Sequence, residues 1–413
     1  MSNMVQEVRQ EQRRRLPLFT LFAASAVSYV GDYLTLIAIP WFVLSTTGSI
    51  TKTGITALFS TLPTVFSAFF GSALVDRLGY KRTSVISDIA SAISVMLIPL
   101  LYNTIGLAFW QLLVLVFLGG LLKSPGATAR TAMVPELVEA AQMGMERANA
   151  INDGVSRISG FIGAPLAGVL IAIIGTSNLL WLDGVSFALS ALLIGAIIPS
   201  ELVHTQMKEK TRSSYWADLG DGMRFIRHDS LILTIVITAF VTNLLDAAFF
   251  SVIEPAYIKQ VFNSAIPLGL ISAALGGAGF VGAILFGAIG HRLPRRLTFG
   301  VAYIVGGALR FWVFLVPILP ILILAHILAG LAIGCINPLI DTITFARIPK
   351  EMRARVFGTI TAGVLVGVPL GTAASGYVAT LLGPRTTIIV IGALYLLITL
   401  SLLVNPALKT MDR

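Results

Sequence analysis

The stretch Gly71-Ser-Ala-Leu-Val-Asp76-Arg77-Leu-Gly79-Tyr-Lys81-Arg82 joins two long apolar runs, which cover residues 53–75 and 83–102. Within it, Gly71 permits close helix approach and Gly79 permits a tight turn. A transmembrane helix needs about 20 residues at a rise of about 1.5 Å per residue, and each run is long enough. The same alternation of apolar run and short polar loop continues along the chain, which predicts an all-α membrane protein.

The composition leads to the same fold class. The 413 residues have a mean hydropathy of +0.88 and only 12% are charged, against about 25% in soluble domains. The single cysteine, Cys335, excludes a disulfide framework or a cysteine-rich metal site within the chain. The net charge of +9 does not indicate nucleic-acid binding, because the basic residues lie in short loops between apolar runs.

The apolar runs predict twelve transmembrane helices in two pseudo-symmetric six-helix bundles. The expected spans are 17–43, 53–75, 83–102, 107–131, 148–174, 178–199, 231–258, 267–289, 298–317, 319–345, 356–382 and 386–405. The first run is too long for a signal peptide, so we expect an uncleaved span. The expected domains are an N-terminus at 1–16, bundles at 17–199 and 231–405, a linker at 200–230 and a C-terminus at 406–413.

Lysine and arginine predict the orientation. Twenty-three of the 29 lie in one set of loops and the termini, three lie in the alternate loops, and Lys123, Arg157 and Arg310 fall inside spans. Cytoplasmic loops carry the excess of basic residues, so both termini and the linker are expected in the cytosol. Both termini on one side require an even number of spans.

The two halves are expected to be repeats of one six-helix unit. Three pairs recur at an offset of 214 or 215 positions: Asp32 with Asp246, Pro135 with Pro349, and Arg77 with Arg292. The linker 200–230 joins the halves and carries Trp216, Leu219, Met223 and Ile226 at helical spacing. This spacing predicts an amphipathic helix, either on the inner membrane surface or packed on the cytosolic ends of the spans.

The segment 71–82 resembles the signature of the major facilitator superfamily, which lies between helices two and three. The resemblance implies that Gly71, Asp76, Arg77, Gly79, Lys81 and Arg82 form a conformational latch. In that family the aspartate contacts the start of helix eleven, here around Arg355 to Gly358, and holds the outward-open state. The alternative is a charged turn that only sets topology. The corresponding loop of the second half has His291 in place of Asp76.

The fifth span also resembles a motif of exporters in this superfamily. Its small residues allow close helix approach, and its proline bends the helix: Gly160, Gly163, Pro165 and Gly168. Ala164 separates the glycine from the proline, which departs from the Gly-Pro pattern of the family. Ordinary packing of small residues is the alternative.

Further phrases resemble the branch that holds macrolide-efflux and enterobactin-export proteins. They are Gly31-Asp32, residues 133–138, 148–150, 221–227 and 348–358. The same branch lies near lysophospholipid transporters, so lipid cargo stays open. The arginine-centred motif of helix four in many proton antiporters is not recognisable, and Lys123 and Arg130 occupy that helix instead.

Charged residues inside spans are costly and mark functional sites. Asp32 and Asp246 lie in the first helix of each half, and the resemblance implies that these helices line a central cavity. They are candidates for proton coupling or binding of a cationic substrate. Alternatively, they are structural carboxylates capped by neighbouring hydroxyls such as Ser28, Thr35 or Thr242.

Other candidates are less specific. Asp153 and Arg157 are four residues apart on span five and are expected to form an intrahelical ion pair, with transport chemistry as the alternative. Lys123, Arg310, Glu254 and Asp341 have no obvious partner in the sequence, and the last two are expected near the membrane interfaces. Aromatic residues near the carboxylates could line an amphipathic pocket or simply pack: Tyr33, Trp41, Phe249 and Phe250.

The function predicted by these features is secondary export of amphipathic small molecules, as in drug efflux and multidrug resistance, by proton antiport and alternating access. A lysophospholipid or siderophore transporter of the same fold is the alternative. A channel would favour a repeated selectivity element, and a membrane enzyme would need catalytic motifs; the sequence shows neither. We expect no cofactor and no metal, and a monomer in the inner (plasma) membrane, by resemblance bacterial.

Overall fold

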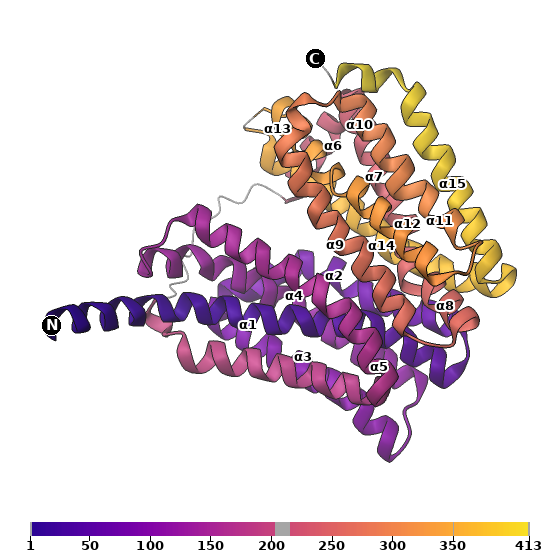
Figure 1. Cartoon of the computed structure of the whole chain (residues 1–413). Helices are drawn as coiled ribbons and strands as arrows, with labels where there is room; N and C mark the ends of the chain where they lie inside the picture. The colour runs from indigo at the N-terminus through magenta and orange to yellow at the C-terminus, as the bar shows by residue number, and fades with distance from the viewer. Residues whose placement is uncertain (1, 203–214, 350, 412–413) are drawn as a thin grey trace. The chain divides into compact units, whose positions relative to one another are not determined.

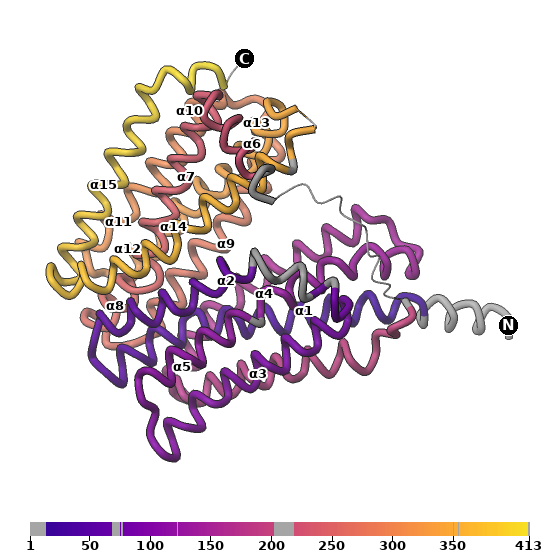
Figure 2. The backbone as a smooth tube through the Cα atoms, turned by 180° about the vertical axis from the view of Figure 1, so that it is seen from behind, coloured from indigo at the N-terminus to yellow at the C-terminus, as the bar shows by residue number. Residues whose placement is uncertain are grey.

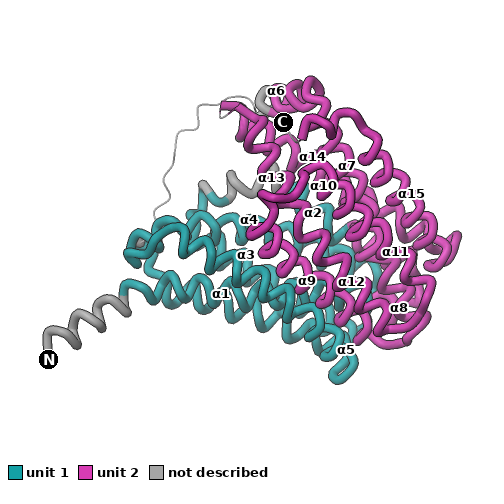
Figure 3. Tube along the Cα trace, turned by 45° about the horizontal axis from the view of Figure 1, so that its top comes forward, with its two compact units in different colours: residues 1–42, 59–208 teal, residues 43–58, 209–413 magenta. Residues whose placement is uncertain are grey.

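The computed structural model describes residues 2–202, 215–349 and 351–411. Within these ranges, the side chains of residues 2–13, 68–74, 76, 122, 202, 215–218 and 354 are not described. The chain forms two compact units (Figure 3): unit 1 comprises residues 1–42 and 59–208, and unit 2 comprises residues 43–58 and 209–413. The end of the first helix and the start of the second thus group with unit 2.

Unit 1 is built from five long helices and one short 3₁₀ turn (Figure 1). They are α1 (Ser2–Thr47), α2 (Ile50–Leu78), α3 (Tyr80–Thr104), α4 (Phe109–Ala140), α5 (Met145–Ile197) and η1 (Ser200–Leu202). α5 contains two transmembrane spans, because Gly175 interrupts it with φ 79° and ψ 163°. Positive φ is accessible to glycine at little cost, so this residue makes the turn between spans five and six.

Unit 2 has shorter helical pieces, several of which continue one another through π-helical turns. They are α6 (Tyr215–His228), α7 (Ser230–Ala248), η2 (Phe249–Ile253), α8 (Glu254–Phe262), α9 (Ile266–Ile289), η3 (Gly290–Arg292), α10 (Arg295–Ala302), η4 (Tyr303–Ala308), α11 (Leu309–Val313), α12 (Leu319–Ile333), α13 (Ile336–Arg347), α14 (Arg353–Leu382), α15 (Pro384–Val404) and η5 (Pro406–Thr410). η2 and η4 are π-helical.

The described residues account for the twelve predicted spans. Nine helices are long and apolar enough by themselves, and α5 among them supplies two spans. α2 and the interrupted segment α10–η4–α11 complete the set. The predicted all-α fold with twelve transmembrane helices in two similar halves is therefore confirmed.

Small residues bring α9 and α12 of unit 2 together. A methyl group at Gly282 would meet the backbone of Leu331, and one at Gly330 would meet the carbonyl of Leu275. Interfaces of this kind let helix backbones approach closely in lipid, where apolar burial gives no net driving force. Figure 2 shows α7 and α14, which also pack against each other within unit 2.

The helix of the linker, α6, packs against the first turns of α14. Asp221 forms an ion pair of 3.0 Å with Arg355, and the hydroxyl of Thr359 donates to the carbonyl of Leu219 at 3.4 Å. A methyl group at Gly222 would collide with Thr359, so glycine sets this close approach. α6 therefore packs against the start of a predicted span, and its position relative to the membrane surface stays a prediction.

Candidate functional site

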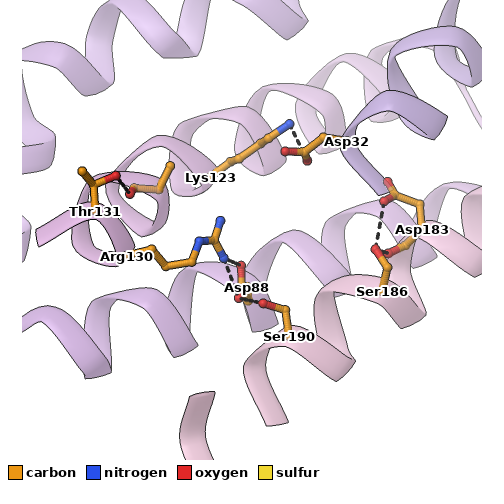
Figure 4. A network of polar contacts seen from close by, with 9 residues as sticks. Asp32, Asp88, Lys123, Arg130, Thr131, Asp183, Ser186 and Ser190 are labelled. Carbon is orange, nitrogen blue, oxygen red and sulfur yellow. Dashed lines mark hydrogen bonds and ion pairs between the residues drawn. The ribbon is translucent and has the colours of Figure 1, made fainter. Parts of the chain in front are cut away.

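Asp32 of α1 is paired with a lysine of α4 in unit 1. The Nζ of Lys123 lies 2.6 Å from Oδ1 of Asp32 (Figure 4). The side chains of Lys123 and Asp32 are 41% and 18% exposed, so this ion pair is only partly buried. The sequence left Lys123 without a partner, and the structure supplies one.

A second carboxylate, Asp183, lies next to this pair. It belongs to the second half of α5, is fully buried, and accepts hydrogen bonds from the hydroxyls of Thr35 and Ser186, the latter at 3.3 Å. It interacts electrostatically with both Asp32 and Lys123. Unit 1 therefore contains two carboxylates and one lysine in a single membrane-embedded cluster.

Gly31 explains how Asp183 reaches α1. A methyl group at position 31 would overlap the Oγ of Ser186 and the Oδ1 of Asp183. The Gly31-Asp32 pair thus has two separate tasks: the glycine leaves room for Asp183, and the aspartate binds Lys123. The Thr35 hydroxyl, considered as a cap for Asp32, binds Asp183 instead.

A buried network lies elsewhere in unit 1. Arg130 of α4 donates through Nη1 to both carboxylate oxygens of Asp88 on α3, at 2.8 and 2.9 Å. Ser190 of α5 donates to Asp88 at 2.7 Å (Figure 4). Arg130, which occupies the predicted fourth span, is 5% exposed and paired, so it is not a free charge of a cytosolic loop. With its carboxylate doubly bound, this network fixes α3, α4 and α5 together.

The glycines of the fifth span pack against α1. A methyl group at Gly160 would meet the ring of Tyr33, and one at Gly163 would meet the Cβ of Tyr33. Gly168 and Pro165 lie further along α5, where the one residue with non-helical backbone angles is Gly175. The small residues of this motif therefore contact a predicted cavity aromatic, Tyr33, which is half-buried.

The remaining candidates of unit 1 are Asp153, Arg157 and Trp41. Asp153 and Arg157 lie one turn apart near the start of α5, and both are exposed. Trp41 is buried near the end of α1. Their part in transport stays a prediction.

In unit 2, Asp246 of α7 forms an ion pair with Arg310 of α11. The guanidinium side chain is 1% exposed, whereas the carboxylate is 28% exposed. Thr242, considered as a cap for Asp246, donates to the carbonyl of Thr238 at 2.8 Å. Asp246 is therefore held by an arginine from another helix.

Aromatic rings enclose this arginine. Its guanidinium carbon lies 4.8 Å from the ring centroid of Phe250 and 4.9 Å from that of Phe311, distances typical of cation–π contacts. Phe249 packs edge-on against Phe250, Phe311 and Phe314. The two predicted cavity aromatics of this half, Phe249 and Phe250, thus contribute to an aromatic cage around Arg310.

Two more ionisable side chains are buried near the cage. Glu254 begins α8, is 1% exposed, and its Oε1 has no hydrogen-bond partner among the described residues. His326 of α12 is fully buried, with Nδ1 2.7 Å from the carbonyl of Leu322 and its ring edge-on to Phe314. Glu254 is buried within unit 2, where η2 and α8 continue α7, and its expected position near a membrane interface stays a prediction. Asp341 is exposed on α13.

The predicted latch is only partly described. The side chain of Asp76 lies outside the described ones, and the surroundings of Gly71 are not described either. Gly79 has φ 81° and caps α3, as expected for a turn glycine, and Arg77 and Arg82 are exposed. The start of α14, the expected partner, is contacted by α6 through Arg355.

Sequence reasoning missed Asp88 and Asp183 as site residues. Both lie inside predicted spans, at 83–102 and 178–199, and a carboxylate inside a span is itself a signal of a functional or paired site. That signal would have found them. It would not have found their partners, which come from other helices.

The spans and the embedded ion pairs define a multi-pass membrane transporter. The Major Facilitator Superfamily model matches residues 21–252 and 235–410, so the chain belongs to this superfamily. This match confirms the predicted family, and it confirms that the protein is a transporter rather than an enzyme. A small-molecule substrate and embedding in the bilayer follow from it.

Relatives and solved structures agree with this assignment. The chain is 29% identical to the multidrug efflux pump Tap of Mycolicibacterium fortuitum over 97% of this chain and 98% of that one. It is 26% identical to the enterobactin exporter EntS of Salmonella typhi, over 92% and 91%. A mutant of the nucleoside transporter NupG superposes with a TM-score of 0.78 at 14% identity, covering 96% of this chain and 100% of that one, and shows the shared fold.

Proposed function

We propose that this protein is a proton-coupled exporter of amphipathic small molecules, drugs among them, in a bacterial inner membrane. The observation that carries the proposal is the pairing of Asp32 with Lys123 at 2.6 Å inside a membrane span. A carboxylate that can exchange its lysine partner for a proton or a cationic cargo is what antiport requires. The resemblance to a named multidrug efflux pump over nearly the whole chain supports the cargo class.

In outline, the cycle exchanges one occupant of Asp32 for another. With Asp32 ionised, the site holds Lys123 or a cationic group of the cargo. With Asp32 protonated, the carboxylate no longer binds a cation, and the cargo is released. If the two states face opposite sides of the membrane, each cargo moves out as a proton moves in. Alternating access between these states, in a monomer, is part of the proposal.

The proposed function is tested with the purified protein in liposomes and an imposed pH gradient. A panel of cargoes should include cationic drugs, a catecholate siderophore and a lysophospholipid. We expect cationic amphipathic drugs to accumulate against their gradient, and only while the pH gradient is present. Drug accumulation that is unaffected by collapsing the pH gradient would refute proton coupling. Accumulation of the siderophore or the lipid alone would instead support the alternative cargo, for which the likeness to an enterobactin exporter is the motive.

The proposed orientation has both termini in the cytosol. Single cysteines at exposed positions, Glu201→Cys and Asn103→Cys in a Cys335→Ser background, report the two faces. An impermeant thiol reagent added to intact cells should label position 103 and leave position 201 unlabelled. The reverse pattern would overturn the orientation, and label at both positions would overturn the assigned topology.

A further inference from the structure

We propose that Glu254 forms a second proton-binding site, in unit 2, in which the single guanidinium of Arg310 is shared between the carboxylates of Glu254 and Asp246. The role of this site in transport rests on the proposed proton-coupled export, whereas proton binding itself does not. Two carboxylates and one arginine lie in one buried cluster, and the described residues place no further cation against Glu254.

Because the cluster is buried, a second carboxylate without a cation is costly. Glu254 is 1% exposed, and Oε1 has no hydrogen-bond partner among the described residues. The Nε2 of His326 also has no partner there, while its Nδ1 faces a carbonyl and must carry the hydrogen. Arg310 interacts electrostatically with both. An ionised carboxylate with no partner is very unfavourable inside a membrane protein, so the cluster in this arrangement calls for a proton on Glu254.

The geometry allows Arg310 to pair with Asp246 or with Glu254, but not with both at once. Asp246 and Glu254 are eight residues apart, which corresponds to about 12 Å along a helix axis. One guanidinium therefore cannot hold both carboxylates at hydrogen-bond distance. In this structure it pairs with Asp246 and leaves Glu254 alone.

The local backbone is unusual on both sides of this pair. The π-helical segment η2 (Phe249–Ile253) separates Asp246 from Glu254, and the π-helical segment η4 (Tyr303–Ala308) ends two residues before Arg310. π-Helical turns are rare and are frequent at functional sites. The two carboxylates and the arginine between which the proposed exchange occurs are thus all next to π-helical segments.

A proton fits this site better than a metal cation. The guanidinium of Arg310 repels a metal ion, whereas a proton needs only one carboxyl oxygen. Of the elements packed against η2 and α8, α9 contains no ionisable residue and α14 contains none between residues 356 and 376. The remaining ionisable groups near the cluster are the following: Tyr257, Lys259, Tyr303, Arg385 and Tyr395.

The proposed step is the deprotonation of Glu254. The O–H bond of the Glu254 carboxyl breaks, the proton leaves, and a carboxylate remains. That carboxylate competes with Asp246 for Arg310. Asp246, whose side chain is 28% exposed, is then released to bind a cationic group. Deprotonation of the buried Glu254 in this way removes Arg310 from the partly exposed Asp246.

The test is infrared difference spectroscopy of the full-length protein in liposomes during a pH titration. We expect a protonated-carboxyl band in the wild type that is lost in Glu254→Gln and retained in Glu139→Gln, an exposed carboxylate on α4. We also expect the band to weaken at fixed pH in Asp246→Asn, because Arg310 is then free to pair with Glu254. A purely structural Glu254 would not produce this coupling.

The outcomes separate this inference from the proposed function. A titrating band that is identical in Glu254→Gln and the wild type would overturn the site. If Glu254→Gln does not fold, Glu254→Asp keeps the carboxyl, and an unshifted band in that variant would overturn the site equally. Replacement of sodium by choline should leave the band unchanged; a sodium-dependent band would contradict a proton site. Wild-type liposomes that show the band but no export driven by the pH gradient would refute the transport proposal and leave the proton site standing.

Discussion

The ion pair of unit 1 and that of unit 2 begin from repeat-related aspartates and diverge from there. Asp32 and Asp246 each lie on the first span of their half, at an offset of 214 positions. Asp32 pairs with a lysine of α4 that is 41% exposed, whereas Asp246 pairs with an arginine of α11 that is 1% exposed. The two cations do not come from equivalent positions in the repeat.

The difference indicates a division of labour. An accessible lysine is a flexible, hydrated point charge and can be displaced by a proton or a cargo. An arginine enclosed by aromatic rings stays charged and stays within its cluster, so the proposed change is limited to which carboxylate it pairs with. Each half also has a second buried carboxylate, Asp183 or Glu254. Each half therefore has an acidic cluster, but of these carboxylates only Asp32 and Asp246 are related by the repeat, and the counter-ions differ.

The largest expected effect comes from removing the buried cation. Arg310→Met leaves Asp246 without its counter-charge, and breaking a buried pair in this way costs about 3–5 kcal/mol. Lys123→Met is the matched change at the less buried pair, where we expect a smaller loss of stability. Thermal unfolding in one detergent compares the two variants. Equal losses would show that the two pairs are not different in kind.

The next largest effect concerns the room that Gly31 provides. Gly31→Ala forces a methyl group into Asp183 and Ser186, and such overpacking costs about 1–3 kcal/mol. Gly154→Ala on α5 is the control, because a methyl group there meets nothing within 4 Å. We expect Gly31→Ala to lower both stability and transport, and Gly154→Ala to leave both unchanged or slightly improved. If both variants behave alike, Asp183 does not depend on Gly31.

The smallest expected effect on stability belongs to the proposed latch. Asp76→Asn keeps the size of the side chain and removes its charge, so transport should fall and the population should move towards the inward-open state. Arg77 beside it is exposed and is left intact. Spin-label distances across the external face, measured with transport on the same protein, check this. Unchanged distances and normal transport would reduce segment 71–82 to a topology signal.

The parts of this account that could be predicted from the sequence depend on local properties. Apolar length and the distribution of basic residues place the twelve spans, and hydropathy alone marks Asp32 and Asp246 as embedded. The partners could not be predicted, because they join helices distant in the chain: Thr35 and Asp183 are 148 residues apart, and Arg310 and Asp246 are 64 apart. The partner of Arg130 could not be predicted either, because at the end of an apolar run the sequence does not distinguish a loop charge from a buried pair.

The central claim is that Asp32 couples cargo to protons. The most direct measurement is gradient-driven export and counterflow on the same purified Asp32→Asn protein in liposomes, beside Glu146→Gln, an exposed carboxylate on α5, as the control. Asp32→Asn cannot gain or lose a proton at this position, so we predict that accumulation against the cargo gradient is lost while counterflow persists. The control should retain both activities. Continued accumulation of cargo by Asp32→Asn under a pH gradient would contradict the account.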